Sequence, residues 1–157
     1  MEYGSILPLS EQELERVIPH RRPFRFIDQI LNVEFGKKAQ AVLSDLRKPE
    51  YDYLKAHFPS YQLVPGVIIM EALAEVGAVA ILGLPENRNR IAVLAGADKV
   101  RWRRQIIPGE LVRLEAEITH LRSKFGRGYG RAFLEDKVAV EGIISFGIID
   151  KPSFFNS

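Results

Sequence analysis

Two side chains able to exchange protons stand fourteen residues apart in the segment HFPSYQLVPGVIIMEAL, residues 57–73. His57 lies among aromatic residues and proline, where a neutral imidazole could act as a base. Glu71 lies in an otherwise apolar run, where loss of water favours the neutral acid and a helix N-terminus favours the anion. A carboxyl group under these two influences could act as a general acid. The segment therefore predicts acid–base chemistry.

A backbone group can complete this arrangement. Gly66 follows Pro65 where the apolar run begins, and proline is well tolerated at a helix start. The first amides of a helix have no partner within it, so the Gly66 amide could bind a developing oxyanion. A structural interpretation stays open at this point. A lone histidine is more often a hydrogen-bonded structural group, and Glu71 could pair with an arginine or face solvent.

Composition limits the class of protein. The 157 residues are 46% hydrophobic and 27% charged, which predicts one folded domain, and a net charge of +2 gives no strong overall field. Without cysteine there are no disulfides and no thiolate catalysis. The N-terminus lacks a signal-peptide pattern, and Glu71 and Glu75 interrupt the longest apolar stretch, so we expect a cytoplasmic protein outside membranes. No two histidines have ligand-like spacing and no acidic cluster accompanies them, so we expect no metal site.

The elements that must position these side chains follow from periodicity and turn residues. Ser10 and Glu13 predict a capping box on a short helix, residues 11–17, which Pro19 ends. The run 67–82 is too long for a buried strand and predicts a helix. Strands are predicted over most of the remainder, within the ranges 24–43 (a hairpin turning at 35–38), 91–104, 111–121 and 129–149 (broken at 135–137), with further turns at 107–110 and 124–128.

This order favours an α+β domain in which one antiparallel sheet packs on one long helix. Apolar residues lie on every side of that helix. A flat sheet covers only one side, so the sheet must wrap around the helix or a second subunit must cover it.

Three ordered motifs carry a family resemblance over about residues 10–150. HFPSYQLVPGVIIMEALAE resembles the active-site segment of FabZ-type 3-hydroxyacyl-acyl-carrier-protein dehydratases, which has the pattern HFPG…PGV…EA. The segment 18–24, followed by Ile27-Asp28, is similar to the family's PHRxPF segment. Residues 98–104 and 107–110 resemble its RFRRPVxPGD segment.

The resemblance implies a hotdog fold, with residues 1–157 as a single domain whose sheet wraps around one long central helix. It implies that His57 removes the α-proton of a (3R)-hydroxyacyl thioester, that Glu71 assists departure of the hydroxyl as water, and that the Gly66 amide holds the thioester carbonyl. It also implies a double-hotdog homodimer whose sites combine His57 and Glu71 from different subunits, possible assembly into hexamers, and no cofactor. Glutamate at position 71, where dehydratase-isomerases usually have aspartate, favours dehydration without isomerisation.

Several positions depart from the family pattern. Ala56 and Ser60 replace glycines, Tyr61-Gln62 replaces a frequent Lys-Pro, and Glu75 stands where glutamine is often found. The expected substrate entrance comprises Phe58, Pro59, Ser60, Tyr61 and Val64. The departures therefore bear on substrate identity more than on the reaction. A hotdog thioesterase, in which Glu71 would activate water, and a non-catalytic acyl-binding paralogue are the alternatives.

Two basic clusters suggest partners. Strand alternation places Val100 and Trp102 on one face and the basic residues on the other. The three on that face are Lys99, Arg101 and Arg103, and they could form a solvated face. The resemblance favours instead a dock for the acidic carrier protein and its phosphopantetheine, formed by these three residues with Arg104. The second cluster begins like an RNA-binding RNP1 motif at Arg127, but Arg131 stands where an aromatic residue is required, so we expect no nucleic acid. For His20 we expect structural hydrogen bonding, and for His120 an exposed position.

Overall fold

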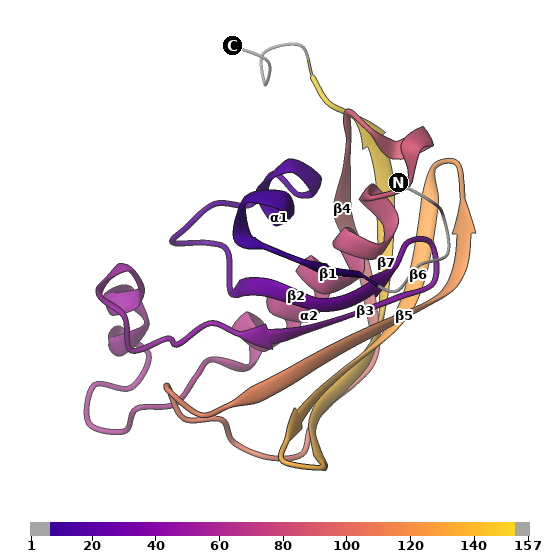
Figure 1. Cartoon of the computed structure of the whole chain (residues 1–157). Coiled ribbons are helices and arrows are strands. Elements are labelled where there is room, and N and C mark those ends of the chain that lie inside the picture. The colour runs from indigo at the N-terminus through magenta and orange to yellow at the C-terminus, as the bar shows by residue number, and fades with distance from the viewer. Residues whose placement is uncertain (1–6, 153–157) are drawn as a thin grey trace.

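A computed structural model describes residues 7–152, and it shows one antiparallel sheet curved around a central helix (Figure 1). The seven strands are, in chain order, β1 (Leu7–Leu9), β2 (Ile27–Glu34), β3 (Lys38–Leu43), β4 (Arg90–Trp102), β5 (Val112–Arg122), β6 (Phe125–Leu134) and β7 (Lys137–Asp150). Their order across the sheet is β1-β2-β3-β5-β6-β7-β4. The predicted α+β class is confirmed, and the sheet wraps around the helix as its apolar surface requires.

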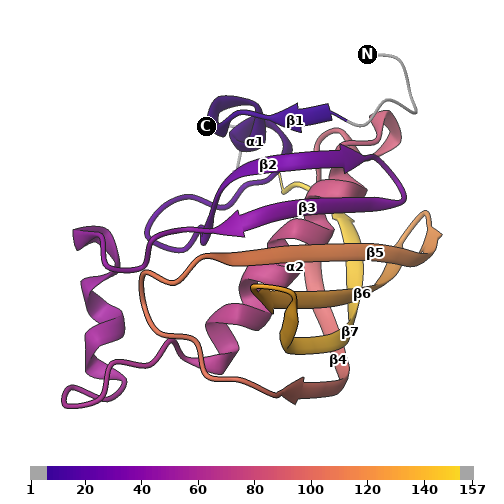
Figure 2. The same ribbon diagram turned by 60° about the horizontal axis from the view of Figure 1, so that its bottom comes forward.

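The central helix, α2 (Gly66–Leu82), carries the core. Fourteen of its 17 residues are buried, and it contacts strands from both halves of the sheet (Figure 2). The short helix α1 (Glu11–Val17) has the predicted capping box: the Glu13 amide donates to the Ser10 hydroxyl, and the Ser10 amide donates to the Glu13 carboxylate. Two 3₁₀ segments, η1 (Pro49–Ala56) and η2 (Pro85–Asn87), connect the larger elements. No helix within residues 7–152 has the length and apolarity needed to cross a membrane.

The two edges of the sheet differ in length. β1, which the sequence did not reveal, is a three-residue strand paired with β2. At the other edge β4 extends over 13 residues and pairs only with β7 in the described part of the chain. Val93, Leu94 and Trp102 are exposed along it. A long edge strand with apolar side chains is a surface that another strand can join.

The turn predicted at 124–128 is wrong, because β6 begins at Phe125 directly after a turn at Ser123-Lys124. The glycines there permit close packing against the helix α2 and the neighbouring strand β5 instead of forming a turn. A Cβ at Gly126 would lie 2.8 Å from a methyl of Ile81, and one at Gly128 would lie 2.9 Å from the Glu117 carbonyl oxygen. The other hairpin turns, at 35–37 and at 135–136, lie where they were predicted.

The regular alternation predicted for residues 99–103 is interrupted by a bulge. The β4–β7 register shifts between Asp98 and Arg101, and Lys99 has a φ of 51°. The extra residue in β4 lies opposite Gly142, where an added Cβ would be 3.0 Å from Val100. Val100 packs against the core, whereas Trp102 beyond the bulge is exposed.

The close packing around Gly128 predicts that an alanine there lowers stability, whereas an alanine at a glycine with open space around it does not. Gly128→Ala forces a methyl group against a backbone oxygen and should lower the free energy of unfolding by about 1–3 kcal/mol, as overpacking does. Gly147→Ala is the matched control, because nothing lies within 4 Å of a Cβ at that position. Urea unfolding at equal protein concentrations measures both variants. Equal destabilisation by the two substitutions would contradict the packing role.

Candidate active site

Glu71 lies on the one strip of α2 that the fold leaves partly uncovered. Val67, one turn earlier, is 69% exposed, and the Glu71 side chain is 21% exposed. Apart from Glu71, all residues of the helix from Ile68 to Leu82 are buried. The predicted acid is therefore held by a rigid buried helix, while its carboxylate reaches the surface near the N-terminal end.

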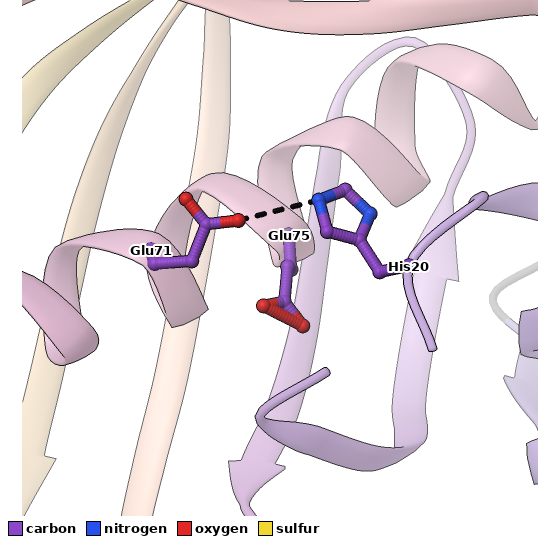
Figure 3. Close-up of side chains that lie close together, drawn as sticks. All are labelled: His20, Glu71 and Glu75. Carbon is purple, nitrogen blue, oxygen red and sulfur yellow. Dashed lines mark ion pairs between the residues drawn. The ribbon is translucent and has the colours of Figure 1, made fainter. Parts of the chain in front are cut away.

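His20 is the side chain that meets Glu71. Its Nε2 lies 3.2 Å from Glu71 Oε1, and Figure 3 shows the imidazole directed at the carboxylate from the connection between α1 and β2. The expectation of structural hydrogen bonding for His20 agrees with this contact. The sequence alone does not indicate that the partner of His20 is the predicted acid, because 51 residues separate His20 from Glu71. The other ring nitrogen, Nδ1, has no protein partner among the described residues.

Glu75 lies one turn further along α2 and is fully buried. Its Oε1 accepts a hydrogen bond of 2.9 Å from the Phe26 amide, whereas Oε2 has no partner in the described part of the chain. Burial raises the pKa of Glu75 to about 9, and the neighbouring charge of Glu71 contributes in the same direction. Glu75 is therefore neutral at physiological pH.

Two arginines hold the α1–β2 connection, which carries His20, in place through ion pairs and hydrogen bonds. Arg25 is fully buried and pairs with Glu11 and Glu15 of α1. Arg22 donates to Asp28 Oδ1 at 2.6 Å and to the Tyr51 hydroxyl at 2.9 Å. These bonds join α1, β2 and η1 around the segment and fix His20 against α2.

His57 lies away from this cluster, in the loop that follows η1. Its ring is exposed and packs on Phe58, and Nδ1 lies 3.4 Å from the Leu63 carbonyl oxygen. No hydrogen bond or ion pair joins His57 to Glu71 within residues 7–152. The described residues of one chain thus do not pair the predicted acid with the predicted base.

A cavity of about 520 Å³ lies beside the start of α2. Its lining includes Val64, Gly66 and Ile69 around the start of α2, together with residues 102–106. Gly66 is required by this packing, since a Cβ there would lie 2.5 Å from the Trp102 indole nitrogen. The predicted carbonyl-binding amide therefore belongs to an element that lines a cavity.

The predicted entrance residues separate into two groups. Val64 is buried and lines the cavity, and the Tyr61 hydroxyl donates to Gln105, another lining residue. The remaining three are exposed in the loop beyond the cavity lining: Phe58, Pro59 and Ser60.

The four basic residues proposed as a dock are all exposed. Arg103 pairs with Glu141 at 3.0 Å, while Arg101 donates only to the adjacent Val100 carbonyl among the described residues. Arg103 and Arg104 line the cavity, so the basic surface adjoins the mouth of the candidate site. His120 is exposed, as expected.

The structure also corrects the statement that no acidic cluster accompanies a histidine. One ligand atom each of His20, Glu71 and Glu75 lies within 4.8 Å of the others. Side-chain spacing in the sequence could not indicate this cluster, because it forms only when the α1–β2 connection packs on α2. The cluster thus brings one imidazole and two carboxyl groups together, and burial favours the neutral form of one of these carboxyls, that of Glu75.

Comparisons with known proteins place these features in a family. A FabA-like domain model matches residues 18–143. The chain belongs to the FabA-like family. Two curated relatives carry the name 3-hydroxyacyl-[acyl-carrier-protein] dehydratase FabZ. The protein from Moorella thermoacetica is 46% identical over 88% of this chain and 95% of its own, and that from Bacillus thuringiensis is 43% identical over 91% and 98%.

Solved structures agree at the level of the fold. The dehydratase heterocomplex ApeI:P from Xenorhabdus doucetiae matches with a TM-score of 0.71 at 17% identity, over 91% of this chain and 95% of that chain. An uncharacterised protein from Pyrococcus horikoshii matches with a TM-score of 0.66 at 17% identity, over 88% and 95%. The hotdog arrangement expected for this FabA-like chain is thereby confirmed.

The fastening of the His20 segment predicts an acid-sensitive contribution to stability. Burial raises the pKa of Asp28, but hydrogen bonds from Ser44 and Arg22 outweigh this and hold that pKa below its ordinary value of 3.8. The stability that the ionised Asp28 contributes is therefore fully present above pH 3.8, the ordinary pKa of an aspartate. It is lost as the pH falls through the lower pKa that Asp28 has in the folded protein. Asp28→Asn should destabilise the protein by about 1 kcal/mol at pH 7, because Asp28 is partly exposed.

Unfolding free energies of both proteins between pH 2.5 and 7 measure this effect. The difference between them should narrow below pH 3.8. A difference that stays constant down to pH 2.5 would show that the Asp28 charge contributes nothing.

Proposed function

We propose that this protein dehydrates (3R)-3-hydroxyacyl thioesters carried on acyl carrier protein to trans-2-enoyl thioesters. The observation that carries the proposal is Glu71, a carboxyl group that is 21% exposed on the buried helix α2, whose first residues line a cavity. Relatives named as dehydratases, at 43–46% identity, support the same function. The family match over residues 18–143 supports this proposal, because it includes His57, Gly66 and Glu71.

The proposed chemistry divides among three groups. His57 takes the α-proton, and the electron pair of that C–H bond forms the C2–C3 double bond as the C3–O bond breaks. Glu71 supplies the proton with which the hydroxyl leaves as water. The Gly66 amide donates to the thioester carbonyl while negative charge develops on it. The cavity that Gly66 lines gives the acyl thioester a place beside this amide.

We propose that the site is completed by a second copy of the chain. No hydrogen bond or ion pair joins His57 to Glu71 in the described residues, and the Glu71 carboxylate is paired with His20 instead. The β4 edge, with Val93, Leu94 and Trp102 exposed, is long enough to extend the sheet into a partner. A double-hotdog homodimer formed there would place His57 of one subunit opposite Glu71 of the other. Assembly of such dimers into hexamers is a further expectation.

A shared site predicts complementation. His57→Ala and Glu71→Gln should each lower kcat for dehydration by at least about 10²-fold, the scale of general acid–base catalysis. After subunit exchange, an equal mixture should regain about a quarter of wild-type activity, because half the dimers are mixed and each has one intact site.

Enoyl formation and free thiol release from a hydroxyacyl-carrier substrate measure this, with mass analysis confirming exchange. A mixture that exchanges subunits yet stays inactive would contradict the shared site. Release of free thiol in place of enoyl product would favour a thioesterase. Binding of the substrate with neither product would favour a non-catalytic acyl-binding protein.

The basic surface predicts a dependence on the carrier. Charge reversal at two of its exposed residues, Arg101→Glu with Arg104→Glu, should raise KM for a carrier-bound substrate about tenfold by removing attraction to an acidic partner. KM for the same acyl group on pantetheine alone should change little. Arg88→Glu, at an exposed position after η2, is the control of equal charge type. Equal effects on both substrates would rule out a carrier dock.

A further inference from the structure

Glu75 is completely buried from solvent. Its side chain has no exposed surface in a single chain, and addition of a partner subunit can only add cover. The one hydrogen bond to its carboxyl group comes from the Phe26 amide, and Oε2 is without a partner in residues 7–152. A carboxylate buried in this way, with one donor, is far less favourable than the neutral acid.

The charged and titratable groups that face Glu75 do little to stabilise its ionised carboxylate. Glu71 lies on the same helix, His20 and Arg25 on the α1–β2 connection, and Tyr53 on η1. His20 is engaged with Glu71.

Arg25 is the fixed cation of this set, and its nitrogens donate to Glu11, Glu15 and the Ile27 carbonyl. None of these hydrogen bonds is directed to Glu75. Both cationic or potentially cationic neighbours are therefore committed to other acceptors.

We propose that Glu75 is a positioning residue that works as a neutral acid, packed behind Glu71 so that Glu71 is the only carboxyl of the pair to exchange protons. This inference rests on the proposed function of Glu71. In neutral form Glu75 has the shape and hydrogen-bonding pattern of glutamine: a carbonyl oxygen accepts from Phe26, and a hydroxyl stands where an amide NH₂ would stand. Glutamate can therefore occupy a position where the family pattern often has glutamine.

Ionisation of Glu75 would disturb the site in a defined way. Two carboxylates one helical turn apart, with ligand atoms within 4.8 Å of each other and of His20, would repel each other and compete for the same imidazole. Glu71 would then lose the neighbour that orients it. Activity should therefore fall as the buried acid loses its proton.

The direction of the pH effect follows from the raised pKa of Glu75, about 9 against an ordinary value of 4.5. A carboxyl group whose pKa is raised in the folded state contributes stability that is fully present below its ordinary pKa, here 4.5. That stability is lost as the pH rises through the folded-state pKa, here about 9. Because of this residue, the stability of the natural protein should decline from about pH 4.5 to about pH 9, whereas its activity should fall around pH 9, where Glu75 ionises in the folded state.

Glu75→Gln tests the proposal in the full-length protein, with Glu117→Gln, which removes an exposed carboxylate of β5, as control. Glu75→Gln should keep kcat at pH 7 within about threefold of wild type, whereas Glu75→Ala, which removes the acceptor of the Phe26 amide, should lower kcat at least about tenfold. From pH 8 to 10 wild type and Glu117→Gln should lose about tenfold in kcat, and Glu75→Gln should not.

Thermal unfolding separates this inference from the proposed function, because it needs no substrate. The Tm of Glu75→Gln should exceed that of wild type by an amount that grows from pH 5 to pH 9, even if the protein were found to lack dehydratase activity. A Tm difference independent of pH, or the same alkaline loss of kcat in Glu75→Gln, would overturn the proposal. So would a rise in Tm on adding Zn²⁺ that Glu75→Gln abolishes, because a metal-bound Glu75 would be ionised.

Discussion

The burial of α2 within the curved sheet is the constraint on which the rest of the structure depends. Fourteen of its 17 residues are buried, so the sheet must bend around the helix, and bending requires close approach of backbone and side chains. The glycines of β6 permit that approach at Ile81 and at the Glu117 carbonyl. A helix enclosed in this way has little freedom to move. It can therefore hold a reactive side chain in a fixed position at its surface.

Because the sheet encloses α2, the position of a polar residue on this helix decides whether its side chain meets solvent or the protein interior. Glu71 lies on the strip that the sheet leaves open, whereas Glu75, one turn later, lies fully inside. Two identical side chains thus meet different environments: one reaches solvent and His20, and the other meets a single backbone amide. Differences of this kind between neighbouring carboxyl groups are how proteins separate the acid that reacts from the acid that stays protonated.

Much of the fold could be predicted from the sequence, because periodicity and capping are local. The long helix, the capping box at Ser10 and the hairpin turn before Lys38 all follow from neighbouring residues. Residues 124–128 misled the prediction because glycine is common both in turns and in closely packed strands, and only the tertiary neighbours distinguish the two. The bulge at Lys99 likewise depends on pairing with β7.

The candidate site was predictable only in part. Glu71 stood out as a carboxyl in an apolar run, and His57 through its motif, yet neither pattern could reveal that His20 contacts Glu71 across 51 residues of chain. That contact depends on how Arg22 and Arg25 fasten the connection between α1 and β2. The exposed β4 edge is also a tertiary property, since strand order decides which strand lies at the edge.

The central claim is that a second copy of the chain completes the acid–base pair. A crystal structure of the assembled protein with a non-reactive hydroxyacyl thioester analogue tests it most directly. The account predicts that the β4 strands of two chains pair, and that the analogue lies between Glu71 of one subunit and His57 of the other. An analogue bound by His57 and Glu71 of the same chain, or an assembly that leaves β4 unpaired, would contradict it.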